Sequence, residues 1–289
     1  MEGNLIAKRL PADNTMTDAV STGGVGRQFT PSAVLTAAGR FWFLAAVTGQ
    51  WLFAYYVALF YGGAAARGDL TAWNKVLAYG YIPGDTMGNL ALGAHLLLAV
   101  IIIVGGPLQL VPQIRRYAPA LHRWNGRVYL PTVFVASISG LYMIWFRGAV
   151  GDVVQHLGMS LDAVLIIAFA ILALRYALAR EISTHRRWAL RLFMVVNGVW
   201  FFRVGLMLWL IVNQGAVGFD PKTFTGPFLS FLSFAEYLLP LAILEIYLRA
   251  KDGARPSFQL TVATGIMAVT LAMGVGIFAA FMGLWLPHI

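Results

Sequence analysis

The chain has 289 residues, of which 59% are hydrophobic and 11% are charged, too few polar side chains to cover a soluble globule. Its formal net charge is +9, but the basic residues are dispersed between apolar runs, so we expect no nucleic-acid partner. It has no cysteine, which excludes disulfides, thiolate metal sites and iron–sulfur clusters.

Apolar runs near 20 residues recur along the chain, each long enough to cross a bilayer of roughly 30 Å as a helix. The sequence therefore predicts an all-α integral membrane protein, a seven-helix transmembrane bundle. Residues 1–36 are polar and are expected to form a flexible cytoplasmic tail, and residues 37–289 a single transmembrane domain. The spans are expected at 40–62, 88–111, 124–146, 157–179, 188–213, 227–248 and 259–285.

Basic residues form four clusters, before the first span and after the second, fourth and sixth spans. By the positive-inside rule, segments rich in Lys and Arg stay in the cytoplasm. The clusters are Lys8, Arg9, Arg27 and Arg40; Arg115, Arg116, Arg123 and Arg127; Arg175, Arg180, Arg186, Arg187 and Arg191; and Arg249, Lys251 and Arg255. We therefore expect a multi-pass protein of a membrane that borders the cytoplasm, with a cytoplasmic N-terminus and an external C-terminus, in contact with membrane lipid.

Four histidines fall one each on the second to fifth spans. His95 and His156 lie on spans that enter from the outer side, whereas His122 and His185 open their spans from the cytoplasmic side. Each pair comes from alternate helices, so its members can meet across a four-helix core of spans 2–5. A haem held by two imidazoles needs such facing ligands. The pattern predicts one or two haem b sites, with His122 and His185 on the inner iron and His95 and His156 on the outer.

Glycines share the faces of two of these histidines, at about 100° per helical residue. Gly106 lies on the His95 face, and Gly126 and Gly140 lie on the His122 face. Glycine leaves room for a flat macrocycle, but it equally permits close packing of helices in a membrane.

Arg203 lies within the fifth span, on the face of His185 but closer to the outer histidines. A guanidinium inside a membrane needs an anion. A haem propionate can supply it, and so can an ion pair with Glu236 or Asp162.

The inner histidines also have a simpler interpretation, since His, Arg and Trp are common at a membrane interface. Arginines surround both of them and can bind haem propionates, an anionic electron donor or acidic lipid head groups, although topology alone requires positive charge there. These are Arg115, Arg116, Arg123, Arg186 and Arg187.

The stretch GPLQLVPQIRRYAPALHRWNGRVYLPTVFVASISGLY and the later THRRWALRLF resemble the bacterial membrane-protein family with domain of unknown function 2306. The resemblance runs from about His95 to Arg203 and implies a multi-span membrane fold. It also implies histidines at His95, His122 and His185, with glycine or an apolar residue at the position of His156. The order of four histidines on successive spans is similar to the b561-type cytochromes, in which two haems pass electrons across the membrane.

We therefore expect a b-type haem protein for transmembrane electron transfer, a possible membrane oxidoreductase of cytochrome b type, with a quinone or another redox partner. Cofactor-binding residues would be the four histidines with Arg203 and Arg123. Two alternatives stay open: a transporter or binding protein for a small substrate or protons, with a polar intramembrane pocket, or a non-catalytic subunit of a larger membrane complex. No Walker A, HExxH, GxSxG or GxGxxG motif occurs, so a hydrolase or nucleotide-driven pump is not indicated.

Overall fold

The computed structural model describes residues 30–289, so most of the tail expected over residues 1–36 lies outside it. The described chain forms long helices, joined by short helical turns and loops. The long helices are α1 (Pro31–Val57), α3 (Thr86–Leu110), α5 (Pro119–Tyr142), α6 (Val153–Leu178), α7 (Ile182–Val196), α8 (Gly198–Val212), α9 (Pro227–Lys251) and α10 (Pro256–Ala280). The short ones are α2 (Gly63–Ala66) and α4 (Pro112–Tyr117), the 3₁₀ turns η2 (Leu70–Lys75) and η5 (Leu286–His288), and the π-helical segments η1 (Ala58–Gly62), η3 (Met143–Gly148) and η4 (Phe281–Trp285).

Local sequence explains where the helices begin. Several open with proline, which has no N–H to leave unpaired in the first turn, as in α1, α5, α9 and α10. Others are capped by a carboxylate: Asp85 accepts from the N–H of Gly88, and Asp152 accepts from that of Gln155. These caps fix the entry of α3 and α6.

Six continuous helical stretches are long and apolar enough to cross a membrane, and α7 with α8 forms one further span, bent by 52°. The predicted all-α membrane bundle is confirmed. Six of the seven spans begin earlier than expected, and the largest differences are at α1, which starts at Pro31, α7, which starts at Ile182, and α5, which starts at Pro119. The fifth expected span is continuous in sequence but broken at Asn197.

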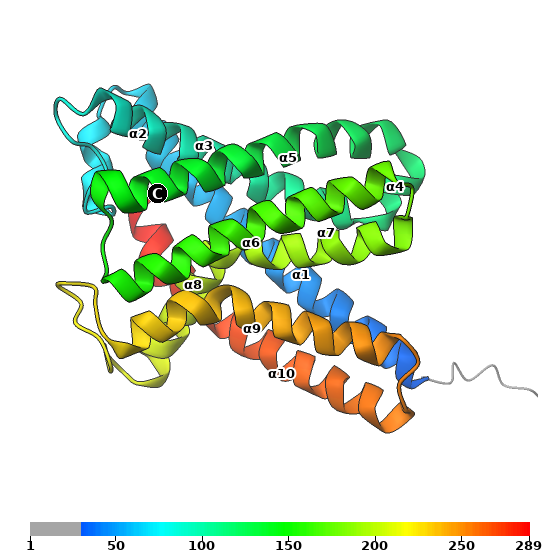
Figure 1. The fold of residues 1–289 in the computed structure, drawn as a ribbon. Helices are drawn as coiled ribbons and strands as arrows, with labels where there is room; N and C mark the ends of the chain where they lie inside the picture. Colours follow the sequence, from blue (N-terminus) through cyan, green and yellow to red (C-terminus); the bar gives the residue numbers. More distant parts are fainter. Residues whose placement is uncertain (1–29) are drawn as a thin grey trace, which may run out of the picture.

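Four helices form a ring in which each packs against its two neighbours, in the order α3, α5, α6, α7. This is the predicted core of spans 2–5. Beyond the break, α8 leaves the ring and packs with α10, which also lies against α1. Helix α9 joins the two groups, since it contacts α6, α7, α8 and α10. Figure 1 shows α9 and α10 side by side, with α1 crossing behind the bundle.

The two ends of the bundle differ in their connections (Figure 1). One end, here called the basic end, holds the start of α1, the short α4 and the tight α6–α7 and α9–α10 turns. The other, here called the loop end, holds the longer segments 67–85 and 213–226 and the C-terminus. The basic clusters between the spans thus gather at one end, as the alternation in sequence predicts.

Candidate functional site

The histidines at the basic end lie on diagonal helices of the ring. His122 is in the first turn of α5 and His185 in the first turn of α7. His185 Nδ1 lies 2.8 Å from the carbonyl oxygen of Ala173 on α6. Because a carbonyl only accepts, Nδ1 carries the proton and Nε2 keeps a free lone pair. The Nδ1 of His122 is buried without any partner.

These two imidazoles are close enough for the charge of His185 to act on His122. The charges of Arg115 and Arg123 also interact with His122, and the charge of Arg186 interacts with that of Arg115. Within residues 30–289, no carboxylate lies within ion-pair distance of these three arginines. The basic end therefore combines two imidazoles that have unused nitrogens with guanidinium groups that have no acidic partner.

Two other arginines at this end form ion pairs that stabilise the fold. Arg191 makes a two-pronged ion pair with Glu245, with Nε–Oε1 and Nη2–Oε2 distances of 2.6 and 3.0 Å. Arg187 pairs with Asp252. Both pairs tie α7 to α9.

His95 lies nine residues into α3, roughly 14 Å from its start at about 1.5 Å per residue. Its Nδ1 is 3.0 Å from Ser139 Oγ, and that hydroxyl donates to the Ala136 carbonyl at 3.0 Å. Ser139 therefore accepts from Nδ1–H, and the Nε2 of His95 keeps a lone pair. This is the tautomer that a metal ligand needs.

His156, in the first turn of α6, packs its ring against Trp145 in η3, which continues α5, with centroids 5.9 Å apart. Its Nε2 is buried without a partner. Ser139, beside His95, and Trp145, beside His156, are six residues apart on one continuous helical stretch. His156 thus lies about 9 Å nearer the loop end than His95, at about 1.5 Å per residue.

The glycines on the histidine faces serve close packing between α3 and α5. A β-carbon on Gly106 would lie 3.3 Å from the hydroxyl of Tyr129. A β-carbon on Gly126 would meet Gln109 at 3.5 Å, and one on Gly140 would meet His95 Cε1 at 3.6 Å. Neighbouring side chains therefore fill the space that these glycines leave.

Arg203 forms neither of the expected ion pairs. It donates to the Val199 carbonyl at 3.1 Å, and its guanidinium carbon lies 5.1 Å from the centroid of the Phe53 ring. Its charge still reaches His95 and Glu236.

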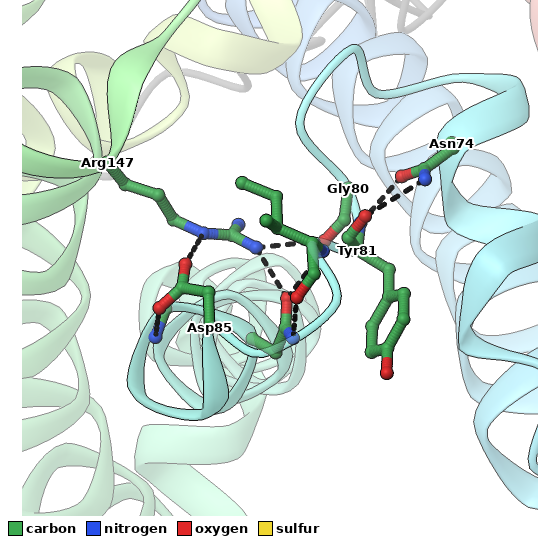
Figure 2. Close-up of polar contacts among 8 residues, drawn as sticks. Asn74, Gly80, Tyr81, Asp85 and Arg147 are labelled. Atoms are coloured by element: carbon green, nitrogen blue, oxygen red, sulfur yellow. Dashed lines mark hydrogen bonds and ion pairs between the residues drawn. The ribbon is translucent and has the colours of Figure 1, made fainter.

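A polar network at the loop end is not apparent from the sequence. Arg147, at the end of α5, donates to Asp85 at 3.0 Å, to Asn89 at 2.6 Å and to the Gly80 carbonyl at 3.3 Å. Figure 2 shows the guanidinium reaching across α3 to the 80–85 segment. Asn74 fastens the same segment through both backbone groups of Tyr81. In sequence, Arg147 is only a basic residue at the end of a span.

Within the described chain, no three His, Cys, Asp or Glu side chains come together to hold a metal ion. Haem does not need such a cluster, because the porphyrin supplies four nitrogens and the protein only the axial ligands. Two open depressions lie away from the ring: one of about 370 Å³ on α9, and one of about 310 Å³ at the loop end beside Arg67, Lys75 and His288.

The comparisons with known proteins identify a family but no activity. A family model described as "Predicted membrane protein (DUF2306)" matches residues 92–239, slightly more than half of the chain. The chain belongs to this family. No curated protein and no solved structure matches the chain.

The DUF2306 match confirms the resemblance expected from the sequence and identifies a membrane protein. It runs from α3 to the middle of α9 and leaves out α1 and α10. The matched part therefore contains the ring except for the first six residues of α3, together with the four histidines of the spans and the break at Asn197.

Proposed function

We propose that this DUF2306 chain is a b-type haem membrane protein that carries electrons between a donor at the basic end and an acceptor at the loop end. The observation that supports this best is the basic-end arrangement of His122 and His185. They lie on diagonal helices within electrostatic reach of each other, each with an unused ring nitrogen. Haem, when bound, would supply the one-electron chemistry.

In this proposal, the chain's own residues bind and orient the cofactor. His185 would ligate iron through Nε2, because its Nδ1 is held by the Ala173 carbonyl. His122 would be the second ligand. Arg115, Arg123 and Arg186 would bind the propionates, since charge-assisted bonds to carboxylates are what guanidinium groups favour.

The outer haem is a second and separable proposal. His95 has a free Nε2, the buried Nε2 of His156 lacks a partner, and Arg203 is near enough to act on His95. The offset of about 9 Å between the two imidazoles, from six residues at about 1.5 Å each, makes this pair the more demanding one. It is therefore tested by itself.

The proposed orientation places the basic end in the cytoplasm of a bacterial cell, because Lys and Arg resist translocation. Reporter fusions after Pro119 should read inside, and those after Gln214 and Ile289 outside. A cytoplasmic C-terminus would contradict the proposal.

The decisive measurement for haem is the absorption spectrum of the protein purified from cells supplied with haem precursor. We expect a bis-histidine Soret band that His122→Ala or His185→Ala removes. His288→Ala is the matched control, because His288 lies at the loop end, where its Nδ1 is 2.8 Å from the Leu284 carbonyl oxygen and its ring packs against Tyr56 and Phe60. Wild-type protein without a Soret band would overturn the proposal.

For the outer pair, reductive titration should resolve two haem components, and His156→Ala should remove only one. A single haem component in the wild type would contradict the outer site, and only the inner site would remain.

A further inference from the structure

Two carboxylates from different helices meet in the middle of the membrane. Asp162 lies nine residues into α6 and Glu236 nine residues into α9, each roughly 14 Å from the loop end at about 1.5 Å per residue. A β-carbon on Gly198 would lie 2.7 Å from Asp162 Oδ2 and 3.6 Å from Glu236 Cδ. Because Gly198 has no side chain, both carboxyl groups reach the break between α7 and α8.

The pair is buried and has no counter-ion in the described chain. Asp162 is 6% exposed and Glu236 4%, and neither forms an ion pair. Asp162 Oδ1 and Asn197 Oδ1 are buried acceptors without any donor, and Asn197 immediately precedes Gly198 at the break. Buried side-chain oxygens inside a membrane that accept no hydrogen bond require a proton or a cation.

Two carboxylates this close cannot both carry charge in a medium of low dielectric constant. Helix α8 begins at Gly198, and the partial positive charge at its N-terminus favours the ionised form of Asp162. Glu236 is then the group that holds the proton. The other ionisable groups that act on the pair are Arg203 on α8 and Tyr237 on α9, whereas α10 has no ionisable side chain.

Polar residues continue from this pair to the loop end along the facing sides of α6 and α9, a strip here called the polar seam. Successive members on each helix are three or seven residues apart, about one or two helical turns, which keeps them near one face of that helix. Helix α6 with its cap contributes Asp152, Gln155 and Asp162, and α9 contributes Ser230, Ser233 and Glu236.

Contacts along the seam join the two helices. Ser230 Oγ donates to Asp152 Oδ2 at 3.2 Å, and Gln155 Nε2 donates to the Phe224 carbonyl at 3.2 Å. A β-carbon on Gly158 of α6 would lie 2.6 Å from Ser233 Oγ, so the α6 backbone approaches that hydroxyl closely. The backbone N–H of Gln155 holds the pKa of Asp152 below its usual value, so a carboxylate charge marks the mouth of the seam.

We propose that Asp162 and Glu236 bind one proton in the middle of the membrane, and that the polar seam is the path by which it arrives from the loop end. The proton comes from water at Asp152 and converts the Glu236 carboxylate to the acid. The site does not depend on haem, and its failure would leave the haem proposal intact.

Infrared spectroscopy of the lipid-reconstituted protein tests the site through the carbonyl stretch of a protonated carboxyl group. We expect this band at neutral pH in the wild type, lost in Glu236→Gln and shifted but kept in Asp162→Asn. Glu245→Gln is the matched control, since Glu245 pairs with Arg191. The proposal fails if the wild type lacks the band or if Glu236→Gln retains it. It also fails if sodium, but not choline, stabilises the wild type against heat and this effect disappears in both variants, because the ligand is then a metal cation.

Hydrogen–deuterium exchange of the same band tests the path. Gly158→Ala places a methyl group against Ser233 and should slow exchange about tenfold, the effect of about 1.4 kcal/mol on a barrier. Ser233→Ala, which adds no bulk, should also slow exchange. Gly265→Ala on α10 faces open space and is the matched control. Exchange at the wild-type rate in both seam variants would mean that protons reach the pair by another route.

Discussion

At the loop end, Arg147 is buried and donates to Asp85, Asn89 and the Gly80 carbonyl. At the basic end, Arg115, Arg123 and Arg186 stand near two histidines, and no carboxylate in residues 30–289 lies within ion-pair distance of them. Through these hydrogen bonds, Arg147 holds the 80–85 segment against two helices. Its guanidinium is occupied by acceptors within the protein. The others are free to bind an anion. Arg147 at the loop end is therefore structural, whereas the basic end holds both the structural Arg187 and Arg191 and these three arginines, which are available for a ligand.

The largest effect on stability is expected for Arg147→Ala. Its loss removes one donor from each of three acceptor groups, of which Asp85 and Asn89 keep a backbone N–H, and should cost on the order of 2 kcal/mol. Thermal unfolding in detergent measures this cost, with the exposed Arg67→Ala as the control. If both variants unfold at the same temperature, the network does not hold the loop end together.

Gly88→Ala should also lower the stability of the protein, but by less than Arg147→Ala. A β-carbon there would overlap the Asp85 carboxylate and lie 2.5 Å from Arg147 Nε. Overpacking of this kind costs about 1 kcal/mol or more. Gly93→Ala, in the same helix, meets only Trp73 at an ordinary 3.4 Å and should be neutral. Equal losses of stability in the two variants would mean that the cost comes from replacing a glycine in α3 and not from disturbing the polar network.

Acid should weaken the loop-end network through Asp85. The Gly88 N–H, and then the Arg147 guanidinium, hold the pKa of Asp85 below its usual value. A carboxyl group whose pKa is lowered by folding stabilises the folded state above its unfolded pKa of about 3.9 and loses this contribution as the pH falls through the folded value. Unfolding temperatures below pH of about 4 should therefore fall more steeply in the wild type than in Asp85→Asn. Parallel curves would contradict this linkage.

The smallest effect on stability is expected for Arg123→Gln at the basic end. Arg123 is exposed and has no acidic partner in the described chain, so the change should stay within about 0.5 kcal/mol. Retention of haem during purification should nevertheless decrease if Arg123 binds a propionate. A loss of stability as large as that of Arg147→Ala would remove the contrast between the two ends.

The sequence predicted the spans, the gathering of basic clusters at one end and the four-helix core, because each depends on hydrophobic length and charge along the chain. It also assigned His95, His122, His156 and His185 to their helices. It did not predict the break at Asn197, since the apolar run continues through it. The ion pair that it offered for Arg203, with Glu236 or Asp162, does not form.

These differences have a common physical origin. Which side chains meet across helices depends on tilt, depth and rotation, and composition fixes none of the three. Arg147 meets Asp85 from 62 positions away along the chain. The proximity of Asp162 and Glu236 requires the missing side chain of Gly198 on a third helix. No local pattern encodes such contacts.

The bend of 52° between α7 and α8 has a geometric consequence. Helix α7 belongs to the ring, whereas α8 packs with α10 in the second group of helices. One span therefore belongs to both groups of helices, and the break at Asn197 lies where the two groups meet. Asp162 and Glu236 approach Gly198 beside this break, so the angle of the bend sets how close the two carboxyl groups lie.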